Sequence, residues 1–264
     1  MKQIKAVIFD WAGTIVDFGC LAPTQVFKDI FKEWNVEITT EEAREPMGLA
    51  KKDHIRALLK MERIRFEWIS FYGEEVTENQ IDEMYEQLQP KMERIVSDFS
   101  EPIPGIVEVI SQLRSNGLKI GSTTGYVKNM MEKIIPIAAS YGLSPDVIVD
   151  SSDCEAGRPA PFMIQRNMEL FGITEPSEIV KVGDTVADIQ EGINAGVWSV
   201  GITATGNEVG LSLTEWNELS DESKKVKIEF ATRKLKDAGA HFIIDEMNQL
   251  ENVIDIINQK LNAF

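Results

Sequence analysis

Short runs of apolar residues alternate with helix-length segments along most of the chain, and this alternation restricts the possible folds more than any other feature. Six of the runs have the length and composition of buried strands: 4–9, 118–121, 147–149, 179–182, 198–202 and 241–244. Strands separated by helices pair in parallel, and the helices then cover both faces of the sheet. The sequence therefore predicts an α/β fold with a doubly wound, Rossmann-like parallel sheet.

One long segment interrupts the alternation. Between residues 18 and 99 the sequence contains only helical patterns, and two of these begin with capping boxes, at Thr39 and at Thr77. We therefore expect a helical cap domain at 18–99, inserted into a core domain that is formed by residues 1–17 and 100–264. Within the core domain, the stretch 220–225 is expected to be a solvated loop that leads into a helix.

The charge of the chain excludes several classes of partner. Its 264 residues include 27 Lys+Arg and 43 Asp+Glu, for a net charge of −16, so nucleic acids and anionic membrane surfaces are repelled at long range. No apolar stretch approaches the roughly 20 residues that cross a bilayer. Two cysteines, Cys20 and Cys154, are too few for a disulfide framework. We expect a soluble, cytoplasmic protein whose partner is a small molecule.

Polar residues gather where the predicted strands end. Asp10 follows the first strand, a hydroxyl-rich turn at 122–124 follows the second, and Arg158 lies in the loop after the third. Asp184 and Asp188 follow the fourth strand. Because the carboxyl ends of parallel strands share one edge of the sheet, we expect these side chains to meet there.

The carboxylates of this set are typical of a magnesium site. Asp10, Asp184 and Asp188 offer oxygen ligands with no His or Cys among them, the donor set that Mg²⁺ prefers when it also binds a substrate phosphate. Taken alone, Asp10 would fit a cap of the next segment equally well, and Asp184 with Asp188 would fit a cap pair at a helix N-terminus. Their combination at one sheet edge favours the metal site.

This order of motifs resembles the haloacid dehalogenase-like hydrolases. The resemblance implies that Asp10 is a nucleophile toward phosphorus, that Thr124 is the hydroxyl and that Arg158 is the cation that hold the phosphoryl oxygens. It also implies a Mg²⁺ site formed by Asp10, the backbone carbonyl of Ala12, Asp184 and, through water, Asp188.

One position departs from the phosphatases and phosphomutases of that superfamily. They carry a second aspartate two residues after the nucleophile, where this chain has Ala12. That aspartate protonates an alkoxide leaving group. The chain is therefore either a disabled enzyme or an enzyme whose leaving group is not an alkoxide.

The helical insertion offers further candidate residues. Met47, Lys51 and His54 are spaced at i, i+4 and i+7, which puts them on one face if the segment is a helix. A Lys–His pair beside a methionine is unusual for a helix face that packs in a hydrophobic core, which favours a functional role. A solvent-exposed helix face would be an equally simple explanation of the two polar residues. The second histidine, His241, falls in the last predicted strand and is expected to be structural.

The motifs together closely resemble the phosphonoacetaldehyde hydrolase (phosphonatase) family over essentially the full length, cap included. The matching segments are 10–14, Cys20, 47–54, 124–126 and 183–185. The resemblance implies hydrolysis of a P–C bond, in the degradation of aminoethylphosphonate, through a Schiff base on Lys51. It places His54, Cys20 and Tyr126 around that lysine, Met47 near the leaving group and Gly48 in substrate binding, and it suggests a homodimer.

The residues themselves leave three questions open. The spacing does not show which of His54, Tyr126 or Cys20 moves protons at Lys51. A magnesium-dependent phosphatase or phosphomutase of the same superfamily is the alternative enzyme, and Ala12 and Lys51 argue against it. A non-catalytic sensor of a phosphorylated ligand is the alternative of a different class.

Overall fold

The computed structural model describes residues 2–263 and contains one six-stranded sheet in the order β3-β2-β1-β4-β5-β6, with every pair of neighbours parallel. The strands are β1 (Ala6–Phe9), β2 (Lys119–Thr124), β3 (Val147–Asp150), β4 (Ile179–Gly183), β5 (Trp198–Ile202) and β6 (Phe242–Ile244). This topology confirms the expected α/β fold. It also puts β1 in the middle of the sheet, between β2 and β4.

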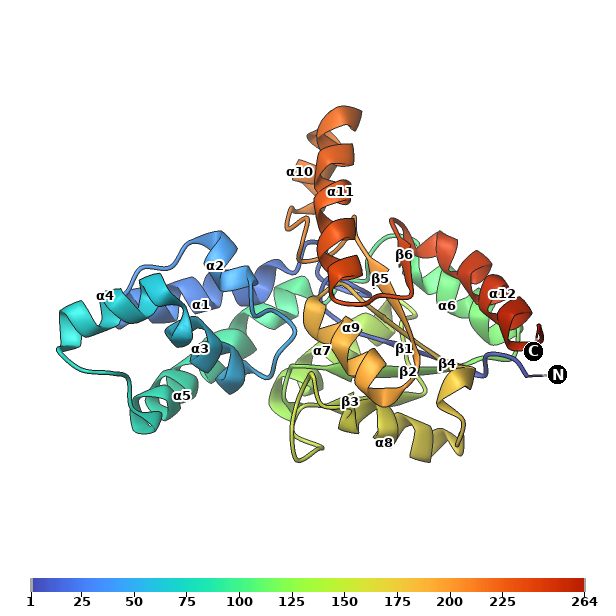
Figure 1. Cartoon of the computed structure of the whole chain (residues 1–264), viewed down its shortest axis with the longest axis horizontal. Helices are drawn as coiled ribbons and strands as arrows, with labels where there is room; N and C mark the ends of the chain where they lie inside the picture. Colours follow the sequence, from blue (N-terminus) through green and yellow to red (C-terminus); the bar gives the residue numbers. More distant parts are fainter. Residues whose placement is uncertain (1, 264) are drawn as a thin grey trace.

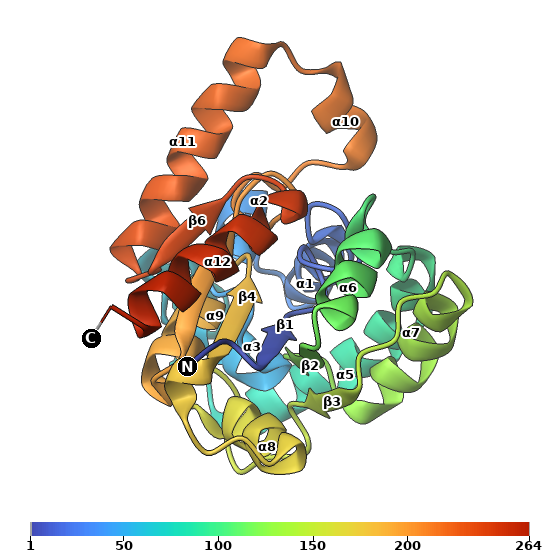
Figure 2. The same cartoon turned by 90° about the vertical axis from the view of Figure 1, so that its right-hand side faces the viewer.

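Helices cover both faces of this sheet (Figures 1 and 2). They are α6 (Ile106–Ser115), α7 (Lys128–Ser140), α8 (Phe162–Phe171), α9 (Val186–Ala195) and α12 (Leu250–Leu261), with short 3₁₀ turns η2 (Pro176–Glu178) and η3 (Met247–Gln249). Alternate residues of β1 belong to different clusters: Val7 and Phe9 pack with α6, α7 and α12, whereas Ala6 and Ile8 pack with α8. Both faces of the central strand are therefore buried, as its apolar run predicts.

A group of helices lies beyond one end of the sheet, on the left in Figure 1. It consists of α1 (Leu21–Glu33), α2 (Thr40–Arg44), α3 (Lys51–Lys60), α4 (Glu62–Tyr72), α5 (Glu78–Ile95) and the 3₁₀ turn η1 (Val96–Phe99). Thr39 and Thr77 form the capping boxes expected of them, and residues 18–99 form no strand. The large side chains of Phe27, Phe31 and Trp68 are buried in its interior.

The chain leaves the sheet for these helices and returns through two paired segments. Val16 forms an antiparallel bridge with Pro102, and the N–H of Ile103 donates to the carbonyl of Ile15 at 2.9 Å. Directly after this pairing, Asp17 adopts a left-handed backbone conformation with φ 54°. Its carboxylate accepts the N–H groups of the first turn of α1, so the side chain serves as the helix cap.

An arm formed by α10 (Leu213–Glu218) and α11 (Asp221–Asp237) extends away from the sheet, as Figure 2 shows at the top. Of α11, only Ala231 and Leu235 are buried. The expectation of a solvated loop at 220–225 is wrong, because Ser220 caps α11 and the helix begins at Asp221.

Some strand ends differ from the predicted ones. The first strand begins at Ala6 rather than at residue 4, and the second extends to Thr124 rather than to residue 121. The expectation that His241 lies in a buried strand is also wrong: it precedes β6 and is exposed, and its Nδ1 accepts the N–H of Ser199 at 3.0 Å. Within residues 2–263, no helix has the length and apolar character that crossing a membrane requires.

Candidate active site

A small cavity lies between the helical group and the carboxyl edge of the sheet. The sheet side contributes Asp10, Ala12, Thr124, Gly125, Tyr126, Arg158 and Thr185, and the helical side contributes Cys20, Pro23, Met47, Gly48 and Lys51. The remaining space is about 20 Å³, which is room for about one water molecule. The structure thus brings nine of the residues singled out in the sequence to one cavity. Asp184 and Asp188 do not line it but have oxygen atoms within 4.8 Å of an oxygen of Asp10, and His54 is buried on the same helix as Lys51.

Asp10 is held at the end of the central strand by the sheet itself. Its N–H donates to the carbonyl of Val182 at 2.9 Å, which continues the β1–β4 ladder by one residue. The loop that follows passes very close to Asp184: a Cβ on Gly13 would lie 2.3 Å from Asp184 Oδ2, and φ of Gly13 is +85°. Only glycine satisfies both conditions, so the glycine after Asp10 brings the loop onto the second carboxylate.

Three buried carboxylates form the polar centre of the site. Oxygen atoms of Asp10, Asp184 and Asp188 lie within 4.8 Å of one another, and burial together with the charge of Asp10 raises the pKa of Asp184 well above its ordinary value. Thr14 Oγ1 donates to Asp184 Oδ1 at 3.0 Å, and the N–H of Asn207 donates to Oδ2 at 2.7 Å. Mutually repelling oxygen donors of this kind could hold a metal ion.

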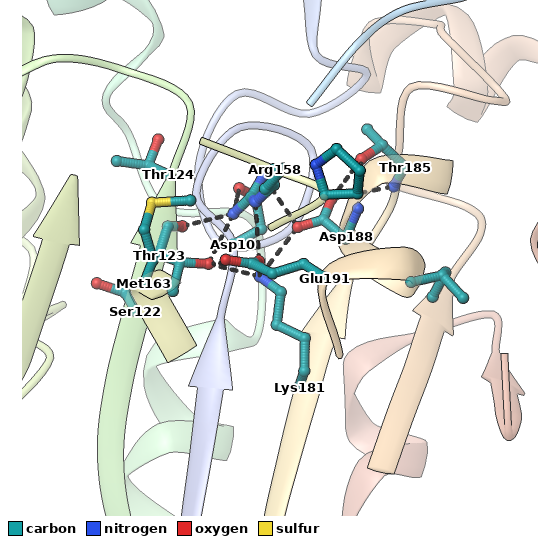
Figure 3. Close-up of polar contacts among 12 residues, drawn as sticks. Asp10, Ser122, Thr123, Thr124, Arg158, Met163, Lys181, Thr185, Asp188 and Glu191 are labelled. Carbon is teal, nitrogen blue, oxygen red and sulfur yellow. Dashed lines mark hydrogen bonds and ion pairs between the residues drawn. The ribbon is translucent and has the colours of Figure 1, made fainter. Parts of the chain in front are cut away.

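Arg158 contacts three carboxylates at once (Figure 3). Its Nη2 lies 2.7 Å from Asp10 Oδ1, its Nη1 lies 3.0 Å from Asp188 Oδ1, and its Nε lies 2.9 Å from Glu191 Oε2. The planar guanidinium can reach all three because its donors point in fixed, divergent directions. Arg158 therefore joins the first strand to α9 underneath the cavity.

A second buried cation, Lys181, supports this cluster and was not predicted. Its Nζ lies 2.9 Å from Asp188 Oδ1, 2.9 Å from Thr123 Oγ1 and 3.5 Å from Glu191 Oε2 (Figure 3). The sequence signal was a single lysine inside the apolar run 179–182, because a charge buried in a strand requires a partner. When ionised, the cluster has two carboxylates more than cations, which suits a divalent metal ion.

Asp188 has the capping role that its sequence position allowed, and it also pairs with the two buried cations. Its Oδ2 accepts the N–H and the hydroxyl of Thr185, which completes a capping box at the start of α9. Its Oδ1 faces Arg158 and Lys181. Burial opposes the charge of Asp188, but the two cations outweigh it and hold its pKa below the ordinary value.

Lys51 enters the cavity from the opposite side. It is the first residue of α3 and only 5% exposed, and its Nζ lies 4.7 Å from the centre of the Tyr126 ring. Burial lowers its pKa from 10.5 to about 8, with Arg158 acting in the same direction and Cys20 and Asp10 opposing it. The helix N-terminus also disfavours a cation at this place. A larger fraction of Lys51 is therefore neutral near pH 7 than of an ordinary lysine.

The expectation that Met47, Lys51 and His54 share one helical face is wrong for Met47. The helix begins only at Lys51, and Met47 lies in the preceding turn. Gly48 breaks the helix: its φ is +90°, and a Cβ there would lie 2.3 Å from Thr185 Oγ1. The turn nevertheless brings Met47 and Gly48 to the wall of the same cavity.

His54 is completely buried behind Lys51, and its ring stacks on Phe27 with 3.7 Å between the ring centres. Its Nε2 lies 2.9 Å from the carbonyl of Ala43. Since a carbonyl only accepts, we assign the proton to Nε2. Nδ1 then has a free lone pair and no partner among the described residues. Burial and the nearby Lys51 hold the pKa of His54 well below its ordinary value, so the ring is neutral.

Cys20 and Tyr126 complete the surroundings of Lys51. Cys20 is a free thiol with left-handed backbone (φ 52°), and burial raises its pKa. Burial also raises the pKa of Tyr126, whose N–H donates to Thr124 Oγ1 at 3.1 Å. Both groups are therefore protonated near neutral pH.

The parallel sheet, the aspartate at the end of its central strand and the acidic cluster beside it are those of a phosphoryl-transferring hydrolase. A family model for haloacid dehalogenase-like hydrolases matches residues 4–196, and the chain belongs to that family. It is 46% identical over 258 residues to a phosphonoacetaldehyde hydrolase from Bacillus cereus (strain B4264), covering 98% of each chain.

Two further comparisons agree with this. The chain is 46% identical to a bifunctional phosphonoacetaldehyde hydrolase/aminoethylphosphonate transaminase from Clostridioides difficile, with 99% of this chain matched but only 41% of that protein. The crystal structure of a phosphonoacetaldehyde hydrolase-like protein from Oleispira antarctica superposes with a TM-score of 0.96 at 39% identity, over 98% of this chain and 94% of that one. The family resemblance inferred from the motifs is confirmed.

Proposed function

We propose that the chain hydrolyses the P–C bond of phosphonoacetaldehyde to acetaldehyde and phosphate. The observation that carries this proposal is the placement of Lys51, an amine with a lowered pKa, in the same small cavity as Asp10. Relatives that match nearly the whole chain and are phosphonoacetaldehyde hydrolases support it.

The chemistry requires both groups. Lys51 Nζ attacks the aldehyde carbon and, with loss of water, forms an iminium. The carboxylate of Asp10 then attacks phosphorus, and the electrons of the P–C bond move into the iminium, so carbon leaves as an enamine rather than as a carbanion. The enamine takes up a proton at carbon. Water finally hydrolyses the imine to acetaldehyde and the aspartyl phosphate to phosphate.

The lowered pKa of Lys51 makes the first step feasible. At pH 7.4 an amine with its ordinary pKa of 10.5 is neutral in about one molecule in a thousand, whereas with a pKa of about 8 it is neutral in about one in five. His54 Nδ1, the Tyr126 hydroxyl and the Cys20 thiol are the proposed proton carriers around it. Because the buried His54 Nδ1 has no partner among the described residues and its ring is neutral, we assign the acceptor role to His54.

The sheet side of the cavity is proposed to hold the phosphonate. Thr124 and Arg158 would bind its oxygens, with Arg158 exchanging Asp10 for the substrate. Asp10, Asp184, Asp188 and the carbonyl of Ala12 would hold Mg²⁺, since the cluster consists of oxygen donors and has two carboxylates more than cations. When bound, Mg²⁺ supplies positive charge to the phosphoryl oxygens.

The size of the cavity implies a moving cap. Room for about one water molecule, about 20 Å³, does not accommodate a seven-atom phosphonate. We propose that residues 18–99 act as a cap domain, with Met47 and Gly48 closing on the leaving group, over a core formed by 1–17 and 100–264. The cap parts from the core to bind substrate and closes to exclude water.

The homodimer and the cytoplasmic location expected from the sequence stay predictions, as does a place in the degradation of aminoethylphosphonate. Two free cysteines are in keeping with a reducing compartment. Light scattering coupled to size-exclusion chromatography measures the oligomeric state directly.

The test of the proposed function is product analysis. Incubation with phosphonoacetaldehyde should release acetaldehyde and phosphate in equal amounts, and EDTA should stop both. Efficient turnover of phosphate esters without cleavage of phosphonoacetaldehyde would instead establish the phosphatase alternative. Binding of phosphonate without any turnover would establish a sensor.

A further inference from the structure

Helix α2 and the loop after β5 are joined by a reciprocal pair of hydrogen bonds. Arg44 Nη1 donates to the carbonyl of Asn207 at 2.9 Å, and Asn207 Nδ2 donates to the carbonyl of Arg44 at 3.1 Å. Arg44 ends α2, on the helical side of the cavity, and Asn207 lies in the loop on the sheet side. Each residue thus uses both its side chain and its backbone to hold the other.

Beside this contact, a lysine bridges Glu45 and Glu208, the residues that directly follow Arg44 and Asn207 in the chain. Lys234 of α11 lies 2.8 Å from Glu45 and 2.9 Å from Glu208. The side chains of Lys234 and Glu208 are 23% and 6% exposed, whereas that of Glu45 is 61% exposed. The contact of Lys234 with Glu45, which connects α11 to the end of α2, is therefore screened by solvent more than its contact with Glu208. We call the set of Arg44, Glu45, Asn207, Glu208 and Lys234 the clasp.

The loop is shaped to receive Arg44. Gly210 has φ +64°, and a Cβ there would lie 1.3 Å from Arg44 Nη1. A side chain at position 210 would therefore occupy the place of the guanidinium. The fit between Arg44 and Gly210 is independent of the hydrogen bonds and shows that the contact is closely packed.

The clasp is also connected to the carboxylate cluster. The N–H of Asn207 donates to Asp184 Oδ2 at 2.7 Å, and a Cβ on the preceding Gly206 would lie 2.4 Å from Asp184 Cβ. The same loop residue therefore holds Asp184 on one side and Arg44 on the other. Movement of α2 away from the sheet removes the two hydrogen bonds between Arg44 and Asn207, and the loop that carries this N–H then keeps the backbone hydrogen bonds within itself.

We propose that Arg44 and Asn207 are positioning residues that couple closure of the cap to the geometry of Asp184. With the clasp formed, the loop 206–210 holds Asp184 in the orientation needed at the metal site. With the clasp broken, the cap opens and Asp184 loses a defined donor. The function of Asp184 and the opening of the cap in this statement rest on the proposed function, whereas the contacts of the clasp do not.

Alkylation of Cys20 by iodoacetamide measures cap opening without substrate or turnover. Cys20 is 2% exposed and lines the cavity, whereas Cys154 is half-buried outside it. Arg44→Ala should speed alkylation of Cys20 about tenfold, the effect of losing a hydrogen bond made by a charged group. Peptide mass spectrometry follows both thiols, and the rate at Cys154 should not change.

The matched control is Arg65→Ala, because Arg65 lies on α4 and pairs only with Glu75 on the same helical side. A rate at Cys20 equal to that of this control would overturn the clasp. Lys234→Met, which loosens the clasp from α11, is the second variant and should speed alkylation about threefold; no increase there would count equally against it. Circular dichroism establishes that each variant is folded.

The coupling to Asp184 has its own readout. Binding of Mn²⁺ to the substrate-free protein, measured by electron paramagnetic resonance, should weaken about tenfold in Arg44→Ala and stay unchanged in Arg65→Ala. Asn207→Ala should weaken it equally, and the double variant no further, because both residues act through one contact. Faster alkylation with unchanged Mn²⁺ affinity would overturn the coupling. Product analysis of the unaltered protein tests the proposed function separately.

Discussion

Arg158 Nη2 lies 2.7 Å from Asp10 Oδ1, and the two side chains are 1% and 7% exposed. The guanidinium thus neutralises the carboxylate at the end of the central strand before any substrate is present. A phosphonate that binds beside Asp10 has to compete for the same donor. Substrate binding and release of Asp10 for attack on phosphorus are therefore one event in the proposed mechanism.

Arg158→Lys should lower kcat/KM for phosphonoacetaldehyde by about a hundredfold or more, since one ammonium cannot replace three divergent contacts. It should also lower the melting temperature, because Glu191 or Asp188 loses one of its two cationic partners inside the protein. Calorimetry and steady-state kinetics measure the two effects. Arg166→Lys, at an exposed ion pair, is the control and should change neither.

Lys51 should form a covalent adduct that borohydride traps. In the presence of acetaldehyde, borohydride should inactivate the enzyme and leave an ethyl group on Lys51. Lys52 is the internal control, because its ammonium pairs with Asp82 away from the cavity. Lys51→Arg should lose P–C cleavage by several orders of magnitude, since arginine stays charged. An adduct found on Lys52 alone would contradict the Schiff base.

The rate of adduct formation should rise with pH, because it follows the neutral fraction of Lys51. Only the neutral amine attacks the aldehyde, so the rate should rise about tenfold per pH unit well below 8 and level off above the pKa of about 8. Trapping with cyanoborohydride at pH 6 to 9.5 measures the profile. A rate that continued to rise tenfold per pH unit up to pH 9.5 would show that Lys51 has its ordinary pKa.

Asp184→Asn should abolish metal-dependent turnover while the fold is retained. The amide keeps the shape of the side chain: its oxygen can accept the N–H of Asn207, and its NH2 group can donate to the Thr14 hydroxyl. It removes the charge that a divalent cation requires. Isothermal titration with Mg²⁺ should show loss of binding. Asp146→Asn, at a surface ion pair with Arg114, should bind normally. Full activity of Asp184→Asn in EDTA would refute the metal site.

Ala12 should make the enzyme a poor phosphatase. Alkyl phosphates need a proton donor for the departing alkoxide, a contribution of about 10² to 10⁴ in rate, and Ala12 lines the cavity without one. Sugar phosphates and glycerol phosphate should therefore be hydrolysed at least about a hundredfold less efficiently than phosphonoacetaldehyde. Phosphate release from such a panel checks this, and comparable rates would favour the phosphatase alternative.

The sheet could be predicted from the sequence because its strands are buried on both faces. The run 6–9 is apolar throughout, and a continuous apolar run of this length is typical of central parallel strands. Strand ends were less predictable: the residues 122–124 that extend β2 are hydroxyl-bearing, and their place in the sheet depends on pairing with β3 rather than on their own composition.

The site could be predicted where chemistry is confined to strand ends, and not where it depends on packing. Lys181 lies in an otherwise apolar strand, and Glu191 is one of several polar residues of α9. Their burial is explained only by the ion pairs that they form with each other and with Arg158 and Asp188. The start of α3 was missed because nothing in the spacing of Met47 and Lys51 shows that Gly48 has a left-handed backbone. The clasp joins residues far apart in the chain, which no local pattern reveals.

The bridge between Val16 and Pro102 has a consequence for how such enzymes diversify. Since the chain leaves and rejoins the sheet at neighbouring points, a tight turn could close the core there without any change in strand order. The helical segment is in this sense a replaceable cassette. Recombination that exchanged this segment would place different side chains over the cavity and leave the residues at the sheet edge unchanged. Only the residues that contact each other across the junction would then have to change together.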